Sequence, residues 1–92
     1  MPVLTSAALT QALTALPDWK LTDGAIVRAF SFRDFREAMS FVNSVASIAE
    51  KAGHHPDIDI RYNKVKLALA SHDAGGITEK DLNQAAEINK LL

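Results

Sequence analysis

Cysteine is absent from this 92-residue sequence, which excludes disulfide bonds and thiolate metal sites. Long apolar runs are missing too, since none approaches the ~20 residues that a membrane-spanning helix needs. The opening segment, MPVLTSAALTQAL, lacks the basic and continuously apolar parts of a signal peptide. Basic residues stand singly and the formal net charge is −1, so the basic stripe of a nucleic-acid-binding protein is also missing. From these absences we expect a cytoplasmic protein that binds neither membranes nor nucleic acids.

Apolar residues are plentiful by contrast, at 48% of the chain, with 23% charged residues beside them. This balance favours a buried core within one domain that covers residues 1–92. A domain of this size buries only about two-thirds of its unfolded surface, so we expect modest stability that self-association would supplement.

The first third of the chain predicts a helix and a hairpin. Apolar residues recur at helical spacing between Ser6, which we assign as the N-cap, and Pro17, which closes the helix. Asp23-Gly24 is typical of a tight hairpin turn. The two strands that it joins are expected at residues 19–22 and 25–32.

A long helix is predicted from about Phe32 to Ala52. Ser31 and Asp34 resemble a capping box at its start, and Gly53 suits the position just after its end. Its apolar residues form an arc of about 180°, whereas a helix that covers one sheet needs only about 100°. Either this helix meets a partner beyond its own sheet, or the extra stripe packs on the other helices, and both interpretations stay open.

The second half of the chain predicts another hairpin. Residues 57–62 and 65–71 alternate between apolar and polar side chains, which is the pattern of strands. A tight turn is expected between them, at Asn63-Lys64.

The final helix completes the predicted fold. Thr78 caps it, with Asp81 at the third helical position. The element order is therefore α-β-β-α-β-β-α. It predicts an α+β domain in which three helices cover one face of a four-stranded antiparallel sheet.

All three histidines lie at the ends of predicted elements, where sites are usually built. His54 and His55 follow the long helix, whose C-terminal end favours a protonated imidazole, and Glu50 lies one turn before His54. Pro56 favours an extended conformation at His55, and adjacent extended residues point to opposite sides. The two rings are therefore expected on different walls of a site.

His72 is expected to join the other two histidines. A two-residue turn between the last two strands pairs Ser71 with Pro56, which places His72 beside His55. Three interpretations of this cluster remain open: acid/base catalysis near neutral pH, a metal site, or surface histidines that end a helix and a strand. The lack of cysteine and the opposite directions of the two adjacent rings disfavour the metal site.

Other candidate residues have structural interpretations. Asp81 is most simply a member of a capping box. Trp19 and Tyr62 are interpreted as core or cross-strand packing. Asp73 either borders the loop beside His72 or begins a turn.

Three spaced motifs stand out in the second half. E-x-x-x-H-H-P covers residues 50–56, Y-N-K-V covers 62–65, and S-H-D-x-G-G-I-T-x-x-D covers 71–81. Together with the W-x-L of the first strand, this pattern resembles the pterin-4a-carbinolamine dehydratases. The resemblance implies the same α+β fold and loss of water from 4a-hydroxytetrahydrobiopterin, which gives the quinonoid dihydropterin. It also implies that no metal or organic cofactor takes part.

The resemblance further implies roles for single residues. His54 and His72 would form the acid/base pair, and His55 would mainly orient the pterin. Glu50 would support His54. The positions expected around the substrate are Glu50, Pro56, Ser71, Asp73, Ala74 and Asp81.

The resemblance also implies partners: a pterin substrate, a second copy of the chain in a homodimer or homotetramer, and an aromatic amino-acid hydroxylase whose tetrahydropterin is recycled. Relatives serve as a dimerisation cofactor of a homeodomain transcription factor or as assembly factors, so the alternative is a non-catalytic binding module. The three histidines favour catalysis. Two positions depart from the family pattern. The family often has an acidic or amide residue where this chain has Gly53, and a tryptophan where it has Ile58. Both departures concern contacts with the substrate.

Overall fold

The computed structural model describes residues 2–92 and confirms the predicted order of elements. None of the helices in this range combines the length and the hydropathy that crossing a membrane requires. The elements are α1 (Ser6–Leu13), β1 (Lys20–Thr22), β2 (Ala25–Ser31), α2 (Phe35–Ala52), β3 (Asp57–Arg61), β4 (Lys64–Leu69) and α3 (Glu79–Asn89).

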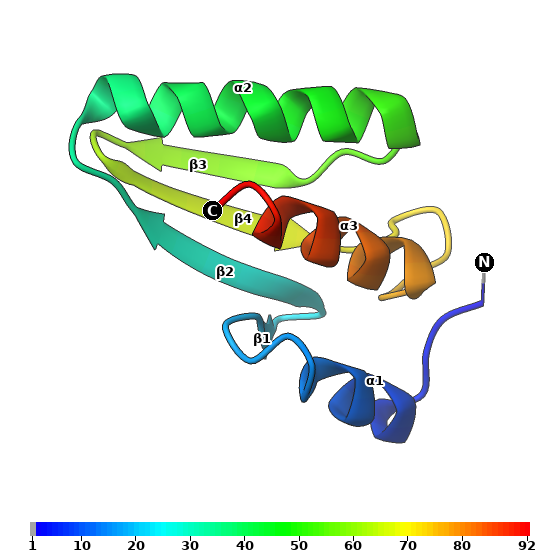
Figure 1. The fold of residues 1–92 in the computed structure, drawn as a ribbon. Coiled ribbons are helices and arrows are strands. Elements are labelled where there is room, and N and C mark those ends of the chain that lie inside the picture. Colours follow the sequence, from blue (N-terminus) through cyan, green and yellow to red (C-terminus); the bar gives the residue numbers. More distant parts are fainter. Residues whose placement is uncertain (1) are drawn as a thin grey trace.

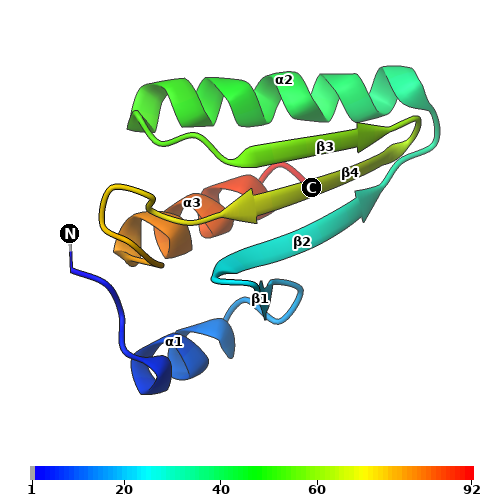
Figure 2. The same cartoon turned by 180° about the vertical axis from the view of Figure 1, so that it is seen from behind.

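The four strands form one sheet in the order β1-β2-β4-β3, and every neighbouring pair is antiparallel. Figure 1 shows α2 running alongside β3, α3 crossing in front of β4, and α1 beside β1. Seen from behind, in Figure 2, the sheet turns its other face to the viewer. The predicted α+β class, with three helices on one face of the sheet, is confirmed.

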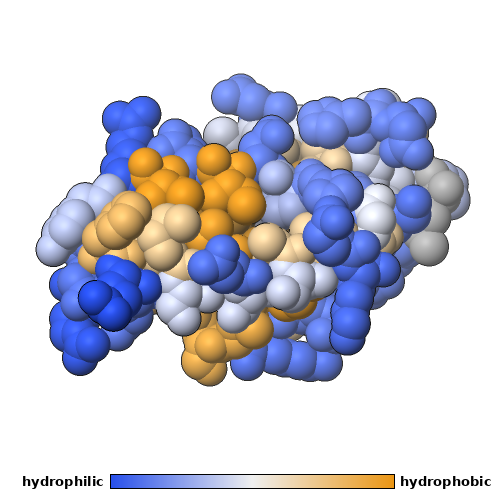
Figure 3. All heavy atoms as spheres, turned by 90° about the horizontal axis from the view of Figure 1, so that it is seen from above, coloured by the Kyte–Doolittle hydropathy of each residue, from blue (hydrophilic) through white to orange (hydrophobic). Residues whose placement is uncertain are grey.

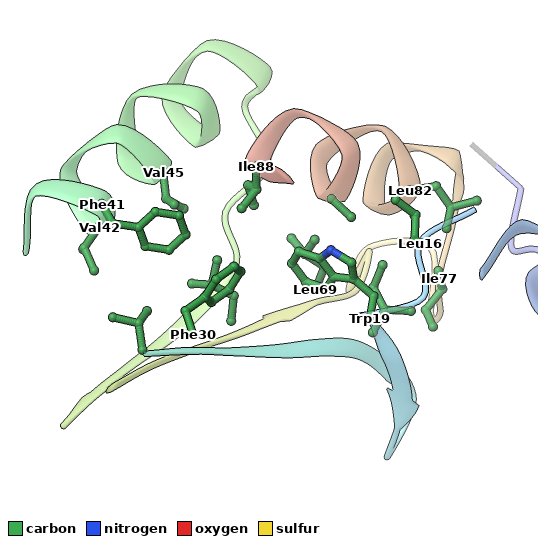
Figure 4. Packing of buried hydrophobic residues seen from close by; sticks show 14 of the residues in the cluster. Leu16, Trp19, Phe30, Phe41, Val42, Val45, Leu69, Ile77, Leu82 and Ile88 are labelled. Carbon is green, nitrogen blue, oxygen red and sulfur yellow. The ribbon is translucent and has the colours of Figure 1, made fainter. Parts of the chain in front are cut away.

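The core lies between the sheet and the helices (Figure 4). Ile26 of β2 pairs with Leu69 of β4, Phe30 pairs with Val65, and all four side chains are buried. Phe41 of α2 packs against Phe30 with 4.7 Å between ring centroids. Burial of these apolar side chains is the main favourable term in folding.

Trp19 is a core residue, as predicted, and it also anchors α3. Its indole Nε1 donates to the side-chain oxygen of Asn89 at 2.9 Å. Arg28 of β2 donates to the same oxygen at 2.7 Å. The C-terminal end of α3 is therefore held to the sheet by a partly buried polar contact.

The wide apolar arc of α2 is divided between core and surface. Phe35 at its start is 50% exposed, and Ile58 and Ile60 of the neighbouring β3 are each 37% exposed. Figure 3 looks down on α2 and shows hydrophobic side chains gathered on this side of the molecule. Within the arc, Met39 and Ile48 are half-buried, and Ala46 and Ala52 are exposed. The residues of the arc that lie in the core are Ala38, Phe41, Val42, Val45 and Ala49.

Two helices begin differently from the prediction. Thr5, not Ser6, is the N-cap of α1, because its side chain accepts a hydrogen bond from the backbone of Ala8 at 3.1 Å. Asp34 is itself the N-cap of α2 and not its third residue. Its carboxylate accepts from the backbone of Glu37 at 2.8 Å, which satisfies a donor that the helix leaves unpaired.

The turn between β3 and β4 lies one residue earlier than predicted. It falls at Tyr62 and Asn63, and Arg61 pairs with Lys64. The side chain of Asn63 donates to the carbonyl of Phe32 at 2.7 Å, and the backbone N–H of Phe32 donates to the carbonyl of Asn63 at 2.9 Å. This contact fixes the turn and keeps Phe32 out of α2.

The register of β3 on β4 is consequently shifted by two residues. The predicted pair of Tyr62 with Val65 is wrong, since Ile60 pairs with Val65. A shift of two residues leaves the strand side chains on their predicted faces. Tyr62 adopts a φ of 53° in the turn and is 65% exposed, so its assignment as packing is also wrong.

Candidate functional site

The end of α2 determines where the first histidine lies. Gly53 has the left-handed φ of 61°, a conformation that glycine adopts without steric cost. The N–H of Gly53 donates to the carbonyl of Glu50 at 3.3 Å, and the N–H of His54 donates to that of Ala49 at 3.1 Å. These two bonds are a Schellman motif, so His54 occupies a defined position just beyond the helix.

The ring of His54 is fixed by Asp81 of α3. Its Nε2 lies 2.5 Å from the Oδ1 of Asp81, and the two side chains are 12% and 0% exposed. An ionised carboxylate only accepts hydrogen bonds, so Nε2 carries a hydrogen and Nδ1 is the free nitrogen. A charge-assisted bond of this kind orients the ring.

Asp81 is held in turn by two further residues. Its Oδ2 accepts from the Ser71 hydroxyl at 3.0 Å and from the Thr78 backbone at 2.9 Å, which confirms the predicted capping box. Because the Ser71 hydroxyl donates to Asp81, the Thr78 hydroxyl donates to Ser71, 2.8 Å away. A chain of hydrogen bonds therefore runs from Thr78 through Ser71 and Asp81 to the His54 ring.

His55 has a separate partner, as the extended geometry before Pro56 predicts. Its Nε2 lies 2.5 Å from the Oε2 of Glu50, and both side chains are exposed. Glu50 was expected beside His54, but it contacts His55, while Asp81 binds the Nε2 of His54. An exposed pair of this kind adds little stability, so it leaves His55 free to reach a ligand.

His72 lies beyond the end of β4, on an exposed loop that a bridge between Ser71 and Gly76 closes. The predicted pair of Ser71 with Pro56 is wrong, because the observed register, continued past β3, would set His55 opposite Ala70. His72 borders a cavity of about 370 Å³, which is lined by Asp23, Gly24, Ala25, Asp57, Ala68, Ala70, Ser71, His72, Gly75 and Gly76.

His54 borders a different cavity, of about 210 Å³, between α2 and α3. Ser71 lies between these two parts of the structure, since it precedes His72 in the chain and its hydroxyl binds Asp81. Within residues 2–92, no group of three or more histidine or acidic side chains is arranged to hold a metal ion. The cavity beside His54 is lined by Ile48, Ala52, His54, Lys80, Asn83, Gln84 and Glu87.

The remaining predicted positions divide by exposure. Ser71 and Asp81 are buried, Pro56 and Ala74 are half-buried, and Asp73 is exposed.

Sequence reasoning missed two residues at this site. Thr78 was recognised as a cap but not as a donor to Ser71. Gln84, whose amide Nε2 donates to the carbonyl of His54 at 2.7 Å, was missed altogether. The available signal was its spacing of three residues from Asp81 on a helix, which places both on one face.

Comparisons with known proteins point in one direction. A family model described as pterin 4 alpha carbinolamine dehydratase matches residues 2–91. A relative from Acidobacterium capsulatum is 58% identical over 92 residues and covers all of both chains. One from Chloroflexus aurantiacus is 53% identical over 92 residues, covering 100% of this chain and 99% of its own. Both are provisionally named pterin-4-alpha-carbinolamine dehydratase.

Solved structures agree with the fold. A crystal structure described as transcriptional coactivator/pterin dehydratase from Brucella melitensis superposes with a TM-score of 0.92, at 40% identity and 97% coverage of each chain. A pterin dehydratase-like protein described as a RuBisCO assembly factor of the alpha-carboxysome gives a TM-score of 0.65 at 22% identity. It covers 79% of this chain and 84% of its own, and at that identity the likeness concerns the fold alone.

Proposed function

The chain belongs to the pterin 4 alpha carbinolamine dehydratase family, and we propose from this premise that it removes water from a 4a-hydroxytetrahydropterin. The product is the quinonoid dihydropterin. The observation that carries the proposal is the His54 ring, held by the fully buried carboxylate of Asp81 at the rim of a cavity. That is the arrangement of a side chain that moves protons.

The dehydration needs two proton transfers. The C4a–O bond breaks, and the departing oxygen takes a proton from an acid and leaves as water. The proton on N5 goes to a base, and its bonding electron pair forms the C=N bond. Imidazoles serve both roles near neutral pH, and His54 and His72 are the proposed acid/base pair.

Asp81 supports the assignment of His54 as the base. Its carboxylate binds Nε2 and leaves Nδ1 free to accept the N5 proton. The cation that forms is then stabilised by the carboxylate beside it. His72 would protonate the leaving oxygen, and the exposed His55 would orient the pterin.

The proposal also gives roles to the other expected substrate positions. Glu50 and His55 would border the open side of the site, and Pro56 would direct the chain into β3. Asp73 and Ala74 would contact the pterin from the loop that carries His72. Ser71 and Asp81 are buried, so we assign them to holding His54 and not to direct contact with the pterin.

A direct assay tests the proposed reaction. We expect purified protein to accelerate dehydration of chemically generated 4a-hydroxytetrahydropterin, followed by ultraviolet absorbance. The double variant His54→Ala/His72→Ala should fall to the uncatalysed rate, because it removes both proton carriers. If wild type and double variant both match the uncatalysed rate, the chain is not a dehydratase.

We also propose that the chain recycles tetrahydropterin for an aromatic amino-acid hydroxylase and forms a homodimer or homotetramer. The exposed Phe35, Ile58 and Ile60 support self-association. The same exposed residues favour a second candidate function, a non-catalytic module that binds another protein. An inactive wild type that captures a partner through these residues would support the second candidate.

A further inference from the structure

Gln84 of α3 contacts the backbone of the residue whose ring Asp81 holds. Its Nε2 donates to the carbonyl oxygen of His54 at 2.7 Å, and its side chain lies almost wholly inside the protein, at 4% exposed. Asp81 precedes Gln84 by three residues, so both point from one face of the helix. α3 therefore forms hydrogen bonds to His54 at two points, the ring and the backbone carbonyl.

We propose that Gln84 is a positioning residue that works with Asp81 to fix the His54 ring for proton transfer. The ring bond to Asp81 and the backbone N–H bond to Ala49 leave the carbonyl of His54 to be held. The carbonyl of His54 lies past the last helical bonds, which end with the N–H groups of Gly53 and His54, so Gln84 supplies the missing anchor. This inference rests on the proposed role of His54.

The other end of the Gln84 amide supports a role beyond packing. Its Oε1 is buried and has no hydrogen-bond partner among residues 2–92. A buried acceptor without a partner opposes folding. An apolar side chain of similar length would fill the space between α2 and α3 without that penalty. The favourable part of the amide is therefore the bond that Nε2 makes to His54.

The variant Gln84→Met tests the proposal. Methionine keeps most of the volume and removes both the donor and the unpaired acceptor. We expect kcat to fall about tenfold, because small displacements of a reacting group are costly, while KM changes little. The carbonyl carbon and ring nitrogen NMR signals of His54 should both shift, since the carbonyl loses its donor and the ring loses its anchor.

Asn89→Leu is the matched control. Asn89 also lies on α3 and also bonds distant residues, Trp19 and Arg28, but it does not touch His54. We expect it to lower stability while kcat and the His54 signals stay at wild-type values. Unchanged kcat and His54 signals in Gln84→Met overturn the proposal. Equal losses of kcat in both variants also overturn it, because general loosening of α3 then explains the effect.

Two further results separate this proposal from the proposed function. If wild type shows no dehydration, the reaction is wrong, but the His54 signals of Gln84→Met still decide whether Gln84 positions the ring. If the reaction is confirmed, adding Gln84→Met to Asp81→Asn should lower kcat by much less than tenfold, because both residues fix one ring. A loss in the double variant equal to the product of the single losses contradicts the shared role.

Discussion

At the scale of single residues, the chain of hydrogen bonds that ends on His54 makes Asp81 the most sensitive position. In Asp81→Asn the amide oxygen must still face the Thr78 backbone and the Ser71 hydroxyl, so its NH₂ group turns toward the Nε2 of His54. The neutral ring then carries its hydrogen on Nδ1 and cannot accept a proton there. We expect kcat to fall by about 10²-fold.

Two measurements make the Asp81→Asn result specific. Urea unfolding should show a loss of about 1–3 kcal/mol from the weakened buried bonds, with the variant still folded at assay temperature. Ser71→Ala is the matched variant: it removes one bond to Asp81 but leaves the bond to His54, so its kcat should fall far less. Equal kcat values for Ser71→Ala and Asp81→Asn would contradict the role given to the ring.

At the scale of elements, the cap of α2 determines where His54 lies. Gly53 has φ of 61°, and an added Cβ would meet nothing within 4 Å. Gly53→Ala should therefore destabilise the fold through backbone strain alone, by roughly 1–2 kcal/mol in chemical unfolding. Gly53→Asn should lose less, because asparagine tolerates this conformation. If both variants lose the same amount, strain at a positive φ is not the cause.

The elements that could be predicted are those whose signals are local in the chain. Thr78 and Asp81 form a capping box three residues apart, and alternation along β3 needs only its neighbouring residues. The β3–β4 turn was misplaced because Asn63 is held by Phe32, which lies 31 residues away. The pairing of His54 with Asp81 spans 27 residues, so no local pattern reveals it. The tertiary fold alone determines which carboxylate meets which imidazole.

At the scale of the whole molecule, exposed apolar side chains on α2 and β3 predict self-association. Phe35 and Ile60 are large, exposed and outside the proposed site. Light scattering of wild type should give twice or four times the mass of one chain. Phe35→Lys/Ile60→Lys should give single chains, because burying two unpaired ammonium groups in an apolar interface is unfavourable.

Leu21→Lys is the control for that change, since Leu21 of β1 is also a large exposed apolar residue, at 55%, but lies on the opposite edge of the sheet. Its mass should equal that of wild type. A wild type that stays a single chain at all concentrations would contradict self-association and leave these side chains for another protein. Dehydration by the single-chain variant then decides whether catalysis needs the assembly. The bonds that fix His54 all come from one chain, so we expect its kcat to be retained.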